Sequence, residues 1–202
     1  MSLWLAEQPL LLASRSKARQ TLLAAAGIAF EVRPADLDER RLELAAPSPA
    51  PAAIATHLAR AKACAVAANS PARLTLGADQ TLALGAECLA KPTDRRAAWA
   101  QLQALRGRTH DLHSAVAFAK DTTVLFEHVG VARLTMRWFS DEFLDRYLDT
   151  AGSAATASVG GYQIEGPGIH LFERVEGDYF TVLGLPLLQV LDFLRRQGCI
   201  AR

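Results

Sequence analysis

Short apolar runs alternate with longer periodic stretches along the chain, which predicts a mixture of strands and helices. Apolar runs at residues 10–13 and 30–33 indicate strands, and the segment 16–26 between them is typical of a helix that ends at Gly27. A longer, alanine-rich helix is predicted over residues 52–68. We therefore expect the chain to begin with a strand–helix–strand unit followed by a second helix.

Most of the predicted strands lie in the middle of the chain. An apolar strand begins at Leu74, Gly85 and Ala86 form a hairpin turn, and residues 87–91 should run back beside it. The remaining expected elements are a helix from Thr93 to Leu105, an antiparallel meander of strands at 113–119, 122–128 and 131–138, a helix from Ser140 to about Asp149, a glycine-rich strand and loop segment at 160–184, and a last helix at 186–196. This order predicts an α/β fold with a mixed sheet.

Composition narrows the class of protein. Half of the 202 residues are hydrophobic and 21% are charged, so the chain can bury a proper core and we expect a single α/β domain over residues 1–202. With 22 basic and 21 acidic residues, the net charge of +1 offers no general attraction for a nucleic-acid backbone or an anionic membrane. We expect neither as a partner, and an anionic ligand must be held locally.

Cysteine usage and the N-terminal segment bear on the compartment. Cys64, Cys88 and Cys199 are odd in number and widely spaced, which suits neither a disulfide framework nor a CxxC zinc site. The first residues lack the basic start and long apolar run of a signal peptide. We therefore expect a reducing compartment, with the cytoplasm as the default.

The first chemical feature is the strand that runs through Ser14-x-Ser16 into a helix. Hydroxyl groups, free backbone N–H groups and the positive end of the helix meet there, with Lys17 and Arg19 nearby. This pattern indicates a phosphate site. The alternative is that the serines only cap the helix and that the basic residues form a solvated face.

Asp79 is the second feature, because it lies within the apolar strand. A carboxylate there is expensive to desolvate unless a cation or a donor meets it. Lys91 is the natural partner, since a hairpin brings together residues that are about equally far from its turn. Beside a cation, Asp79 should stay ionised at neutral pH and be available to bind a metal or to orient water. The alternative is a structural ion pair.

An acidic stretch with Asp36, Asp38 and Glu39 is the third feature. Such a stretch is ordinarily a solvated loop. If it folds back toward Asp79, two carboxylates from distant segments could hold Mg²⁺, a hard ion that takes oxygen ligands.

Several segments together resemble the Maf proteins, which are cytoplasmic nucleoside triphosphate pyrophosphatases. The segments are "LASRSKARQTLLAAAGIAFEVRPADLDE", "LARAKA", "GADQTLALGAECLAKP", "LRGRTH", "GGYQIEGPG" and "GDYFTVLGLPL". They occur in order from about Leu10 to Gly198. The resemblance implies an α/β fold with an elongated mixed β-sheet, flanking helices and a central cleft between two lobes, similar to inosine triphosphate pyrophosphatases, and a homodimer.

The resemblance also implies the site residues. Its catalytic positions fall on Asp79, Glu39, Lys62 and Lys91. Its substrate-binding positions fall on Ser14, Ser16, Arg19, Gln80 and Glu165. The two carboxylates Asp79 and Glu39 would hold a divalent cation, Mg²⁺ or Mn²⁺.

The activity implied is hydrolysis of the α–β phosphate bond of a nucleoside triphosphate, to a monophosphate and diphosphate. Gln80 and Glu165 resemble the 7-methyl-GTP branch of the family, whereas Gly161-Tyr162-Gln163 resembles the dTTP/UTP branch, so the base stays open. The alternative function is a non-catalytic, nucleotide-binding regulator of cell division and septum formation.

Overall fold

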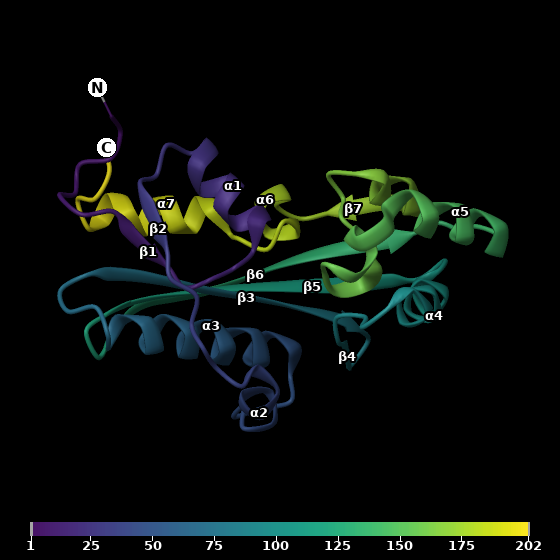
Figure 1. Cartoon of the computed structure of the whole chain (residues 1–202), viewed down its shortest axis with the longest axis horizontal. Helices are drawn as coiled ribbons and strands as arrows, with labels where there is room; N and C mark the ends of the chain where they lie inside the picture. The colour runs from purple at the N-terminus through teal and green to yellow at the C-terminus, as the bar shows by residue number, and fades with distance from the viewer. Residues whose placement is uncertain (1, 202) are drawn as a thin grey trace. The chain divides into compact units, whose positions relative to one another are not determined.

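The structure, a computed structural model, describes residues 2–201 and has the mixed α/β composition that the sequence predicts (Figure 1). The strands in the described residues are β1 (Leu10–Leu12), β2 (Phe30–Val32), β3 (Leu74–Leu84), β4 (Glu87–Leu89), β5 (Thr109–Lys120), β6 (Thr123–Met136) and β7 (Phe172–Glu176). The α-helices are α1 (Lys17–Ala25), α2 (Glu39–Leu44), α3 (Pro51–Ala67), α4 (Arg95–Leu105), α5 (Asp141–Ala151), α6 (Tyr179–Val182) and α7 (Leu187–Arg196). Three 3-10 helices are η1 (Gly152–Thr156), η2 (Val159–Gly161) and η3 (Pro167–Leu171).

The strands form one seven-stranded mixed sheet. Its hydrogen-bonded order is β2-β1-β3-β5-β6-β7, with β4 paired to β3 off this path. β1 runs parallel to both β2 and β3, whereas β3–β4 and β6–β7 are antiparallel. The predicted mixed sheet with flanking helices is therefore confirmed.

The chain divides into two compact units. The first comprises Met1–Gln80, His113–Gly130 and Asp178–Arg202, and the second Thr81–Leu112 and Val131–Gly177. The division falls within β3, β5 and β6, so each of these strands contributes residues to both units. The single domain over residues 1–202 and its central cleft stay predictions.

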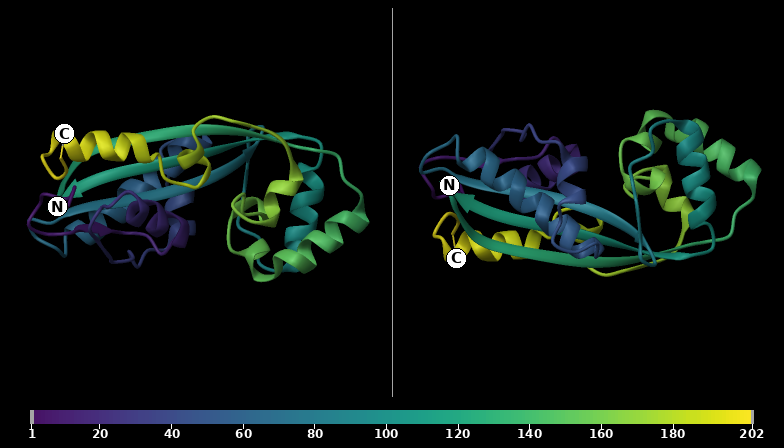
Figure 2. Two further views of the ribbon diagram at one scale, coloured as in Figure 1. Left: turned by 90° about the horizontal axis from the view of Figure 1, so that it is seen from above. Right: turned by 90° about the horizontal axis from the view of Figure 1, so that it is seen from below.

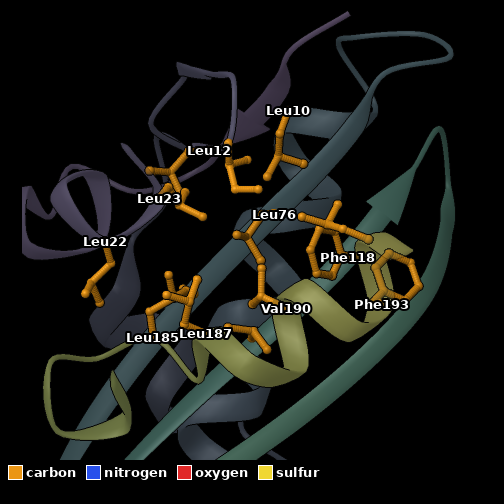
Figure 3. Close-up of a cluster of buried hydrophobic side chains, with 14 of the residues drawn as sticks. Leu10, Leu12, Leu22, Leu23, Leu76, Phe118, Leu185, Leu187, Val190 and Phe193 are labelled. Atoms are coloured by element: carbon orange, nitrogen blue, oxygen red, sulfur yellow. The ribbon is translucent and has the colours of Figure 1, made fainter. Parts of the chain in front are cut away.

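In the first unit, side chains alternate between the two faces of the sheet. Leu10, Leu12, Leu76 and Phe118 point to the face covered by α1 and α7 and pack with residues of those helices (Figures 1 and 3). Successive residues of a strand point to opposite faces, which explains why alternate leucines of β1 enter different clusters. An extensive buried cluster thus lies between the sheet and these two helices.

The opposite face of the first unit is covered by α3. Buried alanines of the helix pack on alanines of β5; the cluster consists of Ala55, Ala59, Ala63, Ala67, Ala115, Ala117 and Ala119. At Gly77 of β3 a Cβ atom would lie only 2.1 Å from the backbone oxygen of Ala59. Small residues on the helix and on the sheet allow α3 to lie close to β3. This close approach brings the Lys62 side chain into contact with Asp79 of β3.

The two ends of the described chain lie together in the first unit (Figure 2). Trp4 and Ile200 form an isolated antiparallel bridge, and the Ala201 amide donates to the Leu3 carbonyl oxygen at 3.0 Å. Segments from opposite ends of the sequence therefore complete the same unit.

In the second unit, α4 and α5 pack against each other and against the 3-10 helices (Figure 2). The buried His110 ring hydrogen-bonds the Tyr162 hydroxyl through Nε2 at 2.7 Å, whereas its Nδ1 has no partner in the described residues. Burial lowers the pKa of His110 to about 4, against a small opposing effect of Asp111. The folded protein therefore holds this imidazole neutral.

This lowered pKa predicts a loss of stability in mild acid. Between about pH 6.5 and 4 the unfolded chain binds a proton at His110 that the folded chain does not, so stability falls as the pH decreases. We expect the free energy of unfolding to fall by about 2 kcal/mol from this residue between about pH 7.5 and 5. Urea unfolding at both pH values should show that His110→Gln removes this part of the pH dependence. The same pH dependence in both proteins would contradict the assignment.

Three expectations about secondary structure are wrong. The segment 160–184, expected as strand and loop, contains β7 but also the 3-10 helix η3 and the short helix α6. Strands predicted at 122–128 and 131–138 are one continuous strand, β6. Gly130 lies in the gap left between the two predicted strands, and a Cβ there would lie 2.7 Å from Thr181 Oγ1, so the glycine permits a close approach. The acidic stretch, expected as a loop, includes the short helix α2, which Asp38 caps by accepting from the Arg41 amide at 3.0 Å.

Thr75 of β3 offers a test of packing in the first unit. Its side chain is fully buried, and Oγ1 has no hydrogen-bond partner in the described residues. Replacing an unsatisfied buried hydroxyl by an apolar group of the same shape is neutral or stabilising. We expect Thr75→Val to raise the free energy of unfolding by about 1 kcal/mol. Thermal and urea unfolding would measure this, and a clear destabilisation would show that the hydroxyl has a partner.

Candidate active site

The site begins where β1 ends beside the longer strand β3. The Ala13 amide still donates to the Leu76 carbonyl oxygen at 2.8 Å. The Ala78 carbonyl oxygen, two residues further along β3, accepts instead from Arg19 Nη1 at 2.8 Å. Ligands of open α/β sheets bind beyond the carboxyl ends of parallel strands. The edge of β3 beyond β1 is such a position.

Arg19 is a buried cation at this edge. In addition to Ala78, its guanidinium donates from Nε to the Gly184 carbonyl oxygen at 2.8 Å and from Nη1 to Ser14 Oγ at 3.0 Å. Burial lowers the pKa of Arg19, and the charges of Asp79 and Glu39 oppose the decrease. An arginine in a protein stays protonated, so this group is a fixed positive charge.

Ser14 and Ser16 lie at the start of α1. Ser16 Oγ accepts from the Arg19 amide at 3.5 Å and caps the helix, while Ser14 Oγ accepts from the Ser16 amide at 3.3 Å. Ser16 therefore caps the helix, but Arg19, which the alternative interpretation assigned to a solvated face, is buried. The first N–H groups of a helix lack intrahelical partners, so the start of α1 keeps donors for an anion. The phosphate role of the two serines stays a prediction.

The cation that contacts Asp79 is Lys62, which lies on α3. Lys62 Nζ lies 2.6 Å from Asp79 Oδ1, and both side chains are about nine-tenths buried. The same ammonium lies 3.0 Å from Glu39 Oε2, on a side chain that is half exposed. Lys62 therefore joins two carboxylates that lie 40 positions apart in the numbering of the chain.

Burial raises the pKa of Asp79, and the charges of Lys62 and Arg19 oppose the increase. The geometry favours the ionised form, because an ammonium group in direct contact donates a hydrogen bond to the carboxylate. A carboxyl group whose pKa lies above its ordinary range is a stronger base than an exposed one. The site thus contains a buried carboxylate suited to accept a proton.

The acidic stretch folds back toward Asp79, as the sequence analysis required for a shared cation. Glu39 begins α2, and Glu43 follows one turn later on the same helix face. Burial raises the pKa of Glu43, with further increases from Asp79 and Glu39. Asp38 serves as the helix cap. Glu39 is thus the acidic residue of the stretch that the structure places on Lys62.

The residues present fit a divalent cation. Asp79 and Glu39 already meet at one positive centre, the Lys62 ammonium, and both offer the oxygen donors that Mg²⁺ prefers. Within residues 2–201, no group of three or more His, Cys, Asp and Glu residues forms a complete metal site. Mg²⁺ is commonly held by one or two carboxylates together with substrate phosphates and water, so two protein ligands are sufficient.

Gln80 follows Asp79 but faces the other side of the sheet. Its side-chain amide Nε2 donates to Ser114 Oγ at 2.9 Å and to the backbone oxygens of Thr181 and Val182 at 3.3 and 3.1 Å. Neighbouring strand residues point in opposite directions, which separates it from the Lys62–Asp79 pair. A direct role of Gln80 in substrate binding stays a prediction.

Lys91 and Glu165 belong to the second unit, where both are exposed. The prediction that Lys91 is the natural partner of Asp79 assumed a hairpin ladder that extends to both residues. The ladder consists of the pair Leu82–Leu89 and two further pairs nearer the turn, and β4 ends at Leu89. The cation that contacts Asp79 is Lys62. The roles that the resemblance gives to Lys91 and Glu165 stay predictions.

Some of the groups that hold Arg19 and Gln80 were not predicted from the sequence. Ser114 and the backbone of Thr181 and Gly184 are these groups. A serine within an apolar strand resembles ordinary sheet filling, and a backbone carbonyl has no sequence signature. One signal in the sequence was the segment "GDYFTVLGLPL", whose second glycine, Gly184, has a positive φ of 88°.

No helix within residues 2–201 is long and apolar enough to cross a membrane.

The chain is similar to known proteins over almost its whole length. The model of the family described as "Maf-like protein" matches residues 9–197. A protein of Rhodopseudomonas palustris (strain HaA2) named nucleoside triphosphate pyrophosphatase is 54% identical over 201 residues, with all of both chains covered. A protein of Brucella abortus biovar 1 (strain 9-941) named 7-methyl-GTP pyrophosphatase is 49% identical over 193 residues, covering 95% of this chain and 97% of its own. The chain belongs to the Maf family.

Proposed function

We propose that the chain is a nucleoside triphosphate pyrophosphatase, a hydrolase that releases diphosphate and a nucleoside monophosphate. Membership of the Maf family and the names of the relatives support this function. The structural observation that carries it is the buried Asp79 carboxylate, with Lys62 at 2.6 Å and the Arg19 guanidinium at the same strand edge. A base and two fixed cations at one place are what attack of water on a phosphate requires.

In this proposal Asp79 accepts the proton of the attacking water. The water oxygen forms a bond to the α-phosphorus, and the bond from that phosphorus to the bridging oxygen breaks, so diphosphate leaves with the bonding electron pair. Negative charge grows on the phosphate oxygens, and Lys62, Arg19 and the N-terminus of α1 stabilise it. Positioning and electrostatics supply most of the acceleration, as in other phosphoryl chemistry.

We propose that Asp79 and Glu39 hold Mg²⁺ or Mn²⁺ together with the substrate. Such an ion polarises phosphate oxygens and neutralises their charge. Lys62, which contacts both carboxylates, fixes their orientation toward a common centre.

A panel assay tests the function. Purified protein is incubated with canonical triphosphates and with 7-methyl-GTP, with Mg²⁺ or Mn²⁺ or with a chelator, and the products are separated by chromatography. We expect a monophosphate and diphosphate in equal amounts, only with the metal. No monophosphate from any member of the panel would overturn the proposal, and binding without turnover would favour the regulator of cell division. The same panel determines the base preference, and we propose that Gln80 and Glu165 contribute to it. We also propose a catalytic role for Lys91, which kinetics of Lys91 variants would test.

We also propose a homodimer and a cytoplasmic location. Cys64 and Cys199 are free thiols, and the three cysteines of the sequence are too widely spaced for a disulfide framework, which supports a reducing compartment. Light scattering after size exclusion would determine the number of copies.

A further inference from the structure

The segment that follows β7 carries three backbone carbonyl groups that accept from side chains of the sheet and of α1. These are the carbonyls of Thr181, Val182 and Gly184, which we call the carbonyl clamp. Gly184 accepts from Arg19, and the other two accept from Gln80. All the residues concerned belong to the first unit.

Ser114 of β5 connects the sheet to the clamp. Its side chain is fully buried, and Oγ donates to the Thr181 carbonyl oxygen at 2.7 Å. A carbonyl only accepts, so the hydroxyl proton must point to Thr181 and the oxygen lone pairs are left for Gln80 Nε2 at 2.9 Å. Ser114 thus has one donor and one acceptor role, and both are used.

The clamp segment itself is held in position. Asp178 Oδ2 accepts from the Thr181 amide at 2.8 Å and from its hydroxyl at 3.0 Å. Gly130 of β6 leaves room for Thr181 against the sheet. Gly184 has a φ of 88°, a conformation that favours glycine, and its amide donates to the Thr181 carbonyl oxygen at 3.0 Å. The orientation of the Gly184 carbonyl therefore depends on the short segment that Ser114 anchors.

We propose that Ser114 is a positioning residue, which acts through the carbonyl clamp to hold Arg19 toward the phosphates of the substrate. A guanidinium that donates to Gly184, Ala78 and Ser14 has its plane fixed by three acceptors from separate segments. Phosphate recognition by arginine depends on this plane. The inference rests on the proposed function.

The test compares Ser114→Ala with Ser70→Ala, which removes another buried, hydrogen-bonded serine hydroxyl of the same unit. We expect Ser114→Ala to raise KM, and the Kd of inorganic tripolyphosphate by calorimetry, about five- to tenfold. The pH midpoint of kcat should stay unchanged, because Asp79 is not altered. Ser70→Ala should leave KM and Kd unchanged. Equal KM and Kd values in the wild type and Ser114→Ala would overturn the proposal.

Two further outcomes are distinguishable. If the wild type binds tripolyphosphate but turns over no nucleotide, the proposed function fails, while the Kd comparison still tests the clamp. If Ser114→Ala does not fold, Gly184→Ala disturbs the clamp from its other end, because alanine is strained at a φ of 88°. It should raise the same Kd, and an unchanged Kd would contradict the proposal.

Discussion

Asp79→Asn is expected to lower kcat by about 10³-fold while the protein stays folded. Asparagine has the shape of aspartate but cannot accept the proton of the attacking water. Lys62 keeps Glu39 as a charged partner at 3.0 Å, so the buried ammonium is not left alone. Steady-state kinetics with a substrate from the panel would measure the loss, and circular dichroism would verify the fold.

The control for this variant is Asp121→Asn in the same unit. Asp121 accepts from the Ala72 amide at 2.7 Å in an exposed turn, and asparagine tolerates its positive φ of 54°. We expect its kcat to match that of the wild type. An Asp79→Asn protein with nearly full turnover would show that Asp79 is not the base and that its bond to Lys62 is a structural ion pair.

Lys62→Met is expected to lower the free energy of unfolding by about 3 kcal/mol and to abolish turnover. Methionine is a good helix former of similar length, so α3 should persist. The loss arises because Asp79, about nine-tenths buried, would remain without its contacting cation. Without Lys62 the pKa of Asp79 should rise further, since the ammonium now opposes the effect of burial.

Two variants make this result specific. Arg60→Met on the same helix removes a partly exposed ion pair with Glu127, with an Nη2–Oε2 distance of 2.6 Å, and surface pairs contribute only about 0–1 kcal/mol. The double variant Lys62→Met with Asp79→Asn should recover much of the lost stability but no activity, because it leaves no buried charge unpaired. Urea unfolding of the wild type, Lys62→Met, Asp79→Asn and the double variant would measure the coupling energy between the two side chains. Additive losses would mean that the two side chains do not interact.

Much of the fold follows from local patterns. The helix that starts at Ser16, the alanine-rich helix and the hairpin turn at Gly85 are determined by capping residues, helix propensity and turn chemistry within a few positions. The length of β6 was mispredicted because it depends on a contact with a residue distant in the sequence. A glycine that permits contact with Thr181 has the same sequence pattern as a glycine that breaks a strand.

The sequence alone was sufficient to predict which residue types take part in the proposed chemistry: a carboxylate within an apolar strand, an acidic stretch, and serines before a helix. Which of these residues meet depends on the packing of the folded chain. Lys62 reaches Asp79 because alanines and Gly77 let α3 lie close to β3, and the ladder past Gly85 is too short for the sequence argument that favoured Lys91. Ser114 and the clamp carbonyls hold Arg19 and Gln80 across more than 30 positions of sequence. Such contacts depend on packing distances, which no spacing along the chain encodes.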